Sequence, residues 1–183
     1  MFSGRSSLVT AMGPTGCGKS FSLFGKEAED RGMVLRVTEY LLERITSEFE
    51  LRAWIYLVHK DSVDNMIHSN MLQTTDEEIP IRSIEDLSVY LARAVESRKQ
   101  LALANKDPKL RFKSHFVIRF SLHKIINNDY HLLSSLIFLD TAGFEFYSNN
   151  PENKVPKTET SWIRHSFNSL IELITEGTTF DFN

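Results

Sequence analysis

The stretch LVTAMGPTGCGKSFSLFG, residues 8–25, decides the fold. Its apolar beginning, Leu8–Met12, stops at a glycine, as a buried parallel strand does before a turn. The residues that follow, GPTGCGKS, fit the pattern G-x-x-x-x-G-K-[ST]. A short helix is expected from Lys19 to Phe24, where Gly25 ends it. This order of strand, glycine loop and helix predicts a phosphate-binding loop, and residues 13–20 are called the phosphate loop below.

The chemistry of the phosphate loop follows from its residue types. Glycines let backbone N–H groups converge on phosphate oxygens, and the helix that follows adds its positive end. Lys19 is predicted to reach the β and γ phosphates, and Ser20 to hold Mg²⁺. Cys17 is interpreted as a small residue that fills the loop rather than as a redox group.

A second element is needed to organise the Mg²⁺ shell, namely an acid at the end of a neighbouring strand. The stretch LIFLDTAGFE, residues 136–145, supplies it. Asp140 closes an apolar strand, and Gly143 permits the backbone to swing. We therefore predict that Ser20 and Asp140 form the metal site together.

The rest of the chain alternates between helical and strand patterns. Three amphipathic helices are predicted. The first spans residues 34–45, the second follows a capping box formed by Ser83 and Asp86, and the third spans residues 163–174. Strands are predicted at residues 51–59, 114–125 and 132–140, the last of them central, and Pro80 limits residues 73–83 to a short edge strand. The fold class is therefore α/β, in one domain, with a mostly parallel or mixed central sheet and helices on both faces.

Composition limits the partners. The net charge of −3 gives no global footprint for nucleic acid, so no nucleic-acid partner is expected. Apolar runs such as Leu132–Leu139 are far shorter than a membrane span, so no membrane partner is expected either. The single cysteine excludes an internal disulfide and agrees with a reducing compartment. A cytoplasmic protein is expected.

The sequence DTAG also occurs in small Ras-like GTPases. In those proteins only a few tens of residues separate it from the phosphate loop, and a guanine-reading N-K-x-D follows. Here the gap runs from Ser20 to Asp140, and the nearest match, Asn105–Asp107, has the wrong spacing and precedes Asp140. The order of motifs therefore argues against a GTPase.

Several blocks, in family order, resemble the kinesin motor domain instead. The sequence AMGPTGCGKSFSLFG resembles the family's AYGQTGSGKTYTMMG, and LIFLDTAGFE resembles its LxLVDLAGSE. Four further blocks also resemble kinesin motifs, at residues 31–45, 53–67, 114–122 and 159–174. Together the blocks run from about Leu8 to Ile174. The sequence is similar to a kinesin motor domain over residues 1–177, and residues 178–183 do not match.

The resemblance implies a microtubule-stimulated ATPase of the cytoskeleton, with ATP and Mg²⁺ as cofactors and microtubules, that is tubulin, as the partner. The implied catalytic residues are Lys19, Asp140, Gly143 and Glu145. The implied nucleotide contacts are Gly13, Pro14, Thr15, Gly16, Cys17, Gly18, Lys19, Ser20, Phe21 and Ser114. Ser114 and His115 match the end of the family's first switch. The helix Thr160–Ile174 matches the relay helix that faces the microtubule. Lys154, Lys157 and Arg164 lie on or just before it and form either a basic patch for acidic tubulin or scattered charges of a solvated surface.

The first switch departs from the family pattern. The residues Arg111, Phe112 and Lys113 stand where the family has Ser-Ser-Arg. A phenylalanine cannot help to order Mg²⁺ and water, and a lysine paired with Glu145 lacks the rigid fork of arginine. Arg164 also replaces a usual asparagine. Three classes of function therefore stay open: a kinesin-type ATPase, a relic of a motor that binds nucleotide or tubulin without a useful cycle, and an unrelated nucleoside-triphosphate kinase or GTPase.

The resemblance also implies strands beside the phosphate-loop strand, and segments after the relay helix, that this sequence lacks. Leu8–Met12 is therefore expected to form an exposed apolar edge of the sheet, of the kind that invites foreign pairing. We expect a truncated or degenerate motor core.

Overall fold

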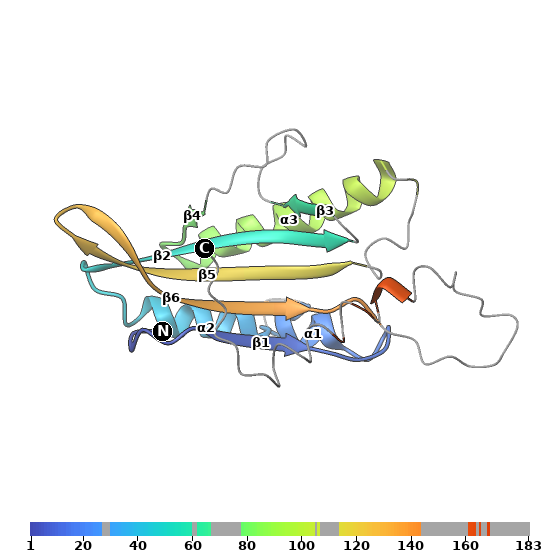
Figure 1. Cartoon of the computed structure of the whole chain (residues 1–183), viewed down its shortest axis with the longest axis horizontal. Helices are drawn as coiled ribbons and strands as arrows, with labels where there is room; N and C mark the ends of the chain where they lie inside the picture. Colours follow the sequence, from blue (N-terminus) through green and yellow to red (C-terminus); the bar gives the residue numbers. More distant parts are fainter. Residues whose placement is uncertain are drawn as a thin grey trace, which may run out of the picture.

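The computed structural model describes residues 1–26, 30–59, 62–66, 78–104, 106, 114–143, 161–163, 165 and 168. These residues form one mixed sheet with helices packed against it (Figure 1). The strands are β1 Ser7–Ala11, β2 Phe49–His59, β3 Ser62–Asn65, β4 Ile79–Pro80, β5 His115–Ile126 and β6 Asp129–Asp140. The helices are α1 Lys19–Phe24, α2 Met33–Leu42 and α3 Ile84–Ala104. Among the described residues, no helix is both long enough and apolar enough to cross a membrane.

The sheet has the strand order β1-β6-β5-β2-β3, and β4 pairs with β2 beside this path. β1 runs parallel to β6, with Ala11 opposite Asp140, and the remaining pairs are antiparallel. The central position predicted for β6 is confirmed. β1 pairs only with β6 and forms an edge of the described sheet, as the sequence led us to expect.

One face of the sheet carries the hydrophobic core. Register places Ile55, Ile118 and Phe138 side by side on this face, and all of them are buried. The helices cover the same face, because Leu23 of α1, Val34 of α2 and Leu87 of α3 belong to the same buried cluster. Figure 1 shows the three helices behind the sheet. The fold class, a mixed sheet with helices, is confirmed, while the three described helices α1, α2 and α3 lie on one face, where the sequence predicted helices on both.

Two helices begin and end close to the predicted positions. α1 has the predicted bounds, and Gly25 caps its carboxyl end. α2 ends at Leu42 rather than at Ile45, because the chain turns there while Ile45 still packs against the core. The predicted helix at residues 163–174 is described only in part, and residues 161–163, 165 and 168 are helical.

The sequence missed two features of the sheet. β3 pairs with the end of β2, and no periodic pattern marked it. β6 begins at Asp129 rather than at Leu132, since a tight hairpin joins it to β5. Asn127 and Asn128 form the turn with φ angles of 53° and 66°. Two central residues with positive φ are typical of the type I′ turn, which favours asparagine.

Candidate nucleotide-binding site

The topology of the sheet brings the two predicted motifs together. The phosphate loop follows β1 and Asp140 ends β6, and these parallel neighbours end at the same edge of the sheet. Thr141 fixes this arrangement, because its amide and its hydroxyl both donate to the carbonyl oxygen of Ala11, at 3.2 Å and 2.9 Å. Motifs that are far apart in the sequence therefore form one site.

The phosphate loop has the backbone conformation that its glycines allow. Gly18, the N-cap of α1, has φ 94° and ψ 10°, in the left-handed region that side chains with a β-carbon disfavour. No side chain caps this helix end. Helix amides that lack a side-chain cap can donate to an anion.

Lys19 turns back over the loop that precedes it. Its ammonium nitrogen donates to the carbonyl oxygens of Gly13 and Pro14, at 3.0 Å and 2.9 Å. The side chain is half-buried and its charge lies at the loop rather than in bulk solvent. A cation in this position suits the phosphate groups of a nucleotide.

Ser20 and Asp140 meet directly. The Ser20 hydroxyl donates to Oδ2 of Asp140 at 2.6 Å, although 120 residues separate them. Asp140 is only 4% exposed. A hydroxyl and a carboxylate are hard oxygen donors, which are the ligands that Mg²⁺ takes in proteins. This pair therefore fits the metal of a Mg²⁺–nucleotide complex.

Gly143 lies against the phosphate loop. A β-carbon at this position would lie 2.9 Å from the backbone nitrogen of Thr15 and 3.1 Å from its Cα, and closer still to its hydroxyl. The hydroxyl could rotate away, but the backbone atoms could not. Residues 140–143, called the DTAG loop below, therefore fit against the phosphate loop only because residue 143 is glycine.

His115 contacts the DTAG loop from β5. The Ala142 amide donates to His115 Nδ1 at 3.0 Å, so this ring nitrogen carries no proton. Burial lowers the pKa of His115 from 6.5 to about 4, which keeps the ring neutral. The His115 ring also lies 5.3 Å from the ring of Trp162, centroid to centroid. The family resemblance matched His115 to the end of the first switch but gave no sign of these contacts.

The sequence matches the family of the kinesin motor domain over residues 1–179. The chain belongs to the kinesin motor domain family. No curated protein matches the sequence.

Two solved kinesin structures have the same fold as this kinesin motor domain. The structure of a fast kinesin superposes with a TM-score of 0.71 at 19% identity, over 98% of this chain and 57% of that one. The structure of KIF14 with ADP in complex with a microtubule superposes with a TM-score of 0.66 at 18% identity, over 92% of this chain and 55% of that one. The chain therefore spans little more than half the length of these two structures.

In this kinesin motor domain, the structure brings most of the predicted site residues together. Those in the phosphate loop are Gly13, Pro14, Thr15, Gly16, Cys17, Gly18, Lys19 and Ser20, and Asp140 and Gly143 adjoin them. Phe21 lies on α1 with 53% of its surface exposed, whereas Ser114 is buried just before β5. The predicted residues Glu145, Lys154, Lys157 and Arg164 lie outside the described residues, as does the segment Arg111–Lys113.

Proposed function

We propose that this chain is a kinesin-type motor core that binds Mg²⁺–ATP and couples its turnover to microtubule binding. The observation that carries the proposal is the hydrogen bond between Ser20 and Asp140, next to the Lys19 ammonium. This hydrogen bond joins the phosphate loop to the acid that ends β6, and a site of this kind needs both elements for ATP hydrolysis. In the proposal, residues 1–177 form the motor core and residues 178–183 lie outside it.

Each residue has a defined task in this proposal. Amides of the phosphate loop and Lys19 bind the phosphates, while Ser20 and Asp140 hold Mg²⁺. Bound Mg²⁺–ATP would supply the phosphoanhydride bond to be cleaved and a metal charge that offsets the negative charge of the phosphates. Gly143 keeps the DTAG loop close to Thr15, so that a change at the phosphates can move the loop.

The proposed partner is the microtubule, and the proposed location is the cytoskeleton of the cytoplasm. The likeness to KIF14, whose structure is a complex with a microtubule, supports this proposal. The sequence adds a basic patch of Lys154, Lys157 and Arg164, which suits an acidic surface such as tubulin.

A second candidate function is nucleotide binding without useful hydrolysis. The sequence Arg111-Phe112-Lys113 favours it, because the family's first switch has serine and arginine at these positions. Phenylalanine offers no oxygen to Mg²⁺ or to the attacking water. In this candidate the phosphate loop keeps its affinity while the rate of phosphate release stays low.

Hydrolysis of Mg²⁺–ATP by the purified chain, with and without microtubules, separates the two candidates. Lys19→Ala provides the inactive reference, and Lys124→Ala, an exposed lysine on β5, is the matched control. Stimulation by microtubules that Lys19→Ala abolishes and Lys124→Ala retains supports the motor. A rate that stays at the Lys19→Ala level, while a fluorescent ATP analogue still binds, supports the second candidate.

Two further measurements limit the proposal. Competition between ATP and GTP for binding, against the fluorescent analogue, tests which base the site prefers. A preference for GTP would overturn the kinesin-type cycle.

Co-sedimentation with microtubules tests whether they are the partner. The triple change of Lys154, Lys157 and Arg164 to glutamate should weaken sedimentation, whereas Lys124→Glu should not. Equal sedimentation of both variants would remove the basic patch from the proposal.

A further inference from the structure

The amide of Ala142 is held by a side chain from another strand. Ala142 is buried within the DTAG loop, and its N–H donates to Nδ1 of His115 at 3.0 Å. His115 opens β5 and is only 8% exposed. A buried backbone amide needs an acceptor, so the position of this ring fixes the position of the loop.

The next residue of the same loop presses on the phosphate loop. Gly143 has no room for a β-carbon against the backbone of Thr15. The DTAG loop is therefore held between Thr15 on one side and His115 on the other. A displacement of Thr15 toward Gly143 must therefore either move Ala142 or break its hydrogen bond to His115.

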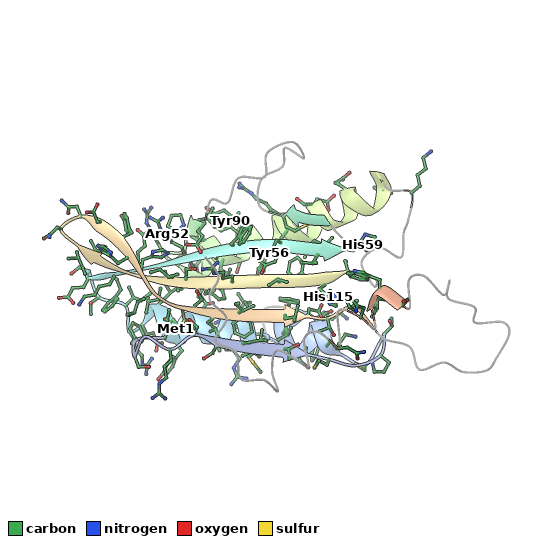
Figure 2. All side chains as sticks on the ribbon, in the orientation of Figure 1. Met1, Arg52, Tyr56, His59, Tyr90 and His115 are labelled. Atoms are coloured by element: carbon green, nitrogen blue, oxygen red, sulfur yellow. The ribbon has the colours of Figure 1, made fainter. Side chains whose placement is uncertain are left out.

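His115 also contacts a helical segment of the chain, through Trp162. The ring of Trp162 lies 5.3 Å from the His115 ring, tilted by 48°, and 5.7 Å from the ring of His59 at the end of β2. Figure 2 labels His59 and His115 at the same end of the sheet. Trp162 is half-buried and its neighbour Ile163 is buried, which seats this helical segment against the ends of β2 and β5.

We propose that His115 is a positioning residue, which holds the DTAG loop against the phosphate loop through the Ala142 amide and passes displacements of that loop to Trp162. This role rests on the proposed function for its purpose, since a nucleotide cycle would supply the displacement. The neutral state of the ring agrees with the role, because only an unprotonated Nδ1 can accept from the amide.

The test displaces the loop by mutation and observes Trp162. The chain has two tryptophans, so Trp54→Phe leaves Trp162 as the sole fluorescent indole. Gly143→Ala in that background pushes the DTAG loop away from Thr15. We expect the emission maximum of Trp162 to shift, although residue 143 has no ring contact with it.

Two variants of His115 separate its ring contact with Trp162 from its hydrogen bond to Ala142. His115→Asn puts an amide oxygen near the position of Nδ1 but removes the ring, so the Ala142 amide should stay protected while the Trp162 shift is lost. His115→Gln carries the same amide one methylene further out, so the protection of the Ala142 amide should be lost as well. Exchange of the Ala142 amide with solvent should be about tenfold faster in His115→Gln than in His115→Asn. His59→Ala is the matched control, because it removes a ring contact of Trp162 and leaves the His115–Ala142 hydrogen bond in place, and the shift should survive it.

Either of two results overturns the inference. One is an unchanged Trp162 emission in Gly143→Ala with His115 present. The other is equal exchange of the Ala142 amide in the asparagine and glutamine variants, which share polarity and differ in reach. Each variant is first checked for a cooperative thermal transition, and Ala142 exchange gives a second readout where a fluorescence change is small. All these measurements are made without nucleotide, so a failure to bind ATP would overturn the proposed function and leave this result intact.

Discussion

The two ends of the sheet both carry polar clusters, and the clusters differ in kind. One end carries the turn between β5 and β6 and is called the hairpin end. There, Glu78 accepts from the hydroxyl of Ser121 and lies 2.9 Å from Nε2 of His123. Arg52 pairs with Glu50 at 2.5 Å and stacks over Tyr130. At the phosphate-loop end, Lys19 contacts backbone carbonyls, and Ser20 contacts Asp140. Figure 2 labels Arg52 away from the end of the sheet at which it labels His59 and His115.

The difference lies in what the charged groups contact. The side chains of the hairpin end complement one another, carboxylate against hydroxyl, imidazole and guanidinium. At the phosphate-loop end, the lysine ammonium contacts two backbone carbonyl oxygens, and the Asp140 carboxylate accepts from the Ser20 hydroxyl, which are groups that can bind phosphate and Mg²⁺. Substitutions at the hairpin end should therefore alter stability, and those at the phosphate-loop end should alter ligand binding and turnover.

The largest expected effect is that of Asp140→Asn on ATP turnover. The amide keeps the shape of the side chain and can still accept from Ser20, but it loses the charge that would hold Mg²⁺. Turnover should fall about 1000-fold, equivalent to about 4 kcal/mol of transition-state stabilisation. The measurement is phosphate release at saturating Mg²⁺–ATP.

The matched control is Asp129→Asn, an exposed carboxylate at the opposite end of the same strand. It should leave turnover unchanged. Similar losses in both variants would contradict the contrast between the two ends.

The second effect is an acid-induced loss of stability at the phosphate-loop end. The pKa of His115 is lowered from 6.5 to about 4 by burial. Between these pH values the unfolded chain binds a proton that the folded chain does not, so stability is present above pH 6.5 and falls as the pH drops. The loss amounts to about 3 kcal/mol by pH 4. Urea unfolding at a series of pH values measures it.

His115→Asn supplies the control for this pH dependence, since it can accept from Ala142 and does not titrate. The free energy of unfolding of this variant should fall less between pH 6.5 and 4 than that of the unmodified chain. The difference equals the contribution of His115. Parallel curves for the two proteins would show that other groups cause the acid sensitivity.

The third effect belongs to the hairpin end. Glu78→Gln keeps the volume of the side chain but removes the charge that faces Ser121, His123 and Arg119. The free energy of unfolding should fall by about 2 kcal/mol, as expected for hydrogen bonds to a partly buried charge. Nucleotide affinity should not change. Glu85→Gln, an exposed carboxylate of α3, is the matched control for urea unfolding.

The phosphate-loop end was predictable in its parts because its signals are local. Glycine spacing fixed the loop and α1, and an apolar run that ends at an acid fixed β6 and Asp140. The contacts between these parts were not predictable. The contact of Gly143 with Thr15 and the hydrogen bond of Ala142 to His115 depend on the register between strands that are distant in the sequence. No local sequence pattern encodes that register.

The hairpin end was predicted less well. Its turn uses Asn127 and Asn128 without the glycine that usually marks such turns, and Glu78 lies in a segment with no periodic pattern. Its function as a stabilising cluster depends on pairing between β2 and β5, which antiparallel register sets. Resemblance to the family did not supply it either, since none of the matching motifs includes Glu78.

The smallest expected effect tests a feature that sequence predicted fully and that belongs to neither end. Ser83 Oγ accepts from the Asp86 amide at 3.1 Å, and Asp86 Oδ2 accepts from the Ser83 amide at 3.1 Å, which closes the predicted capping box of α3. Ser83→Ala should lower the free energy of unfolding by about 1 kcal/mol, and Ser83→Gly by only a few tenths of that, because glycine is tolerated at an N-cap. Urea unfolding measures both. Since α3 packs on the core and Ser83 contacts Asp86 rather than the phosphate loop, neither variant should alter nucleotide affinity. A loss of affinity in Ser83→Ala would mean that general destabilisation, rather than local chemistry, governs the phosphate-loop end.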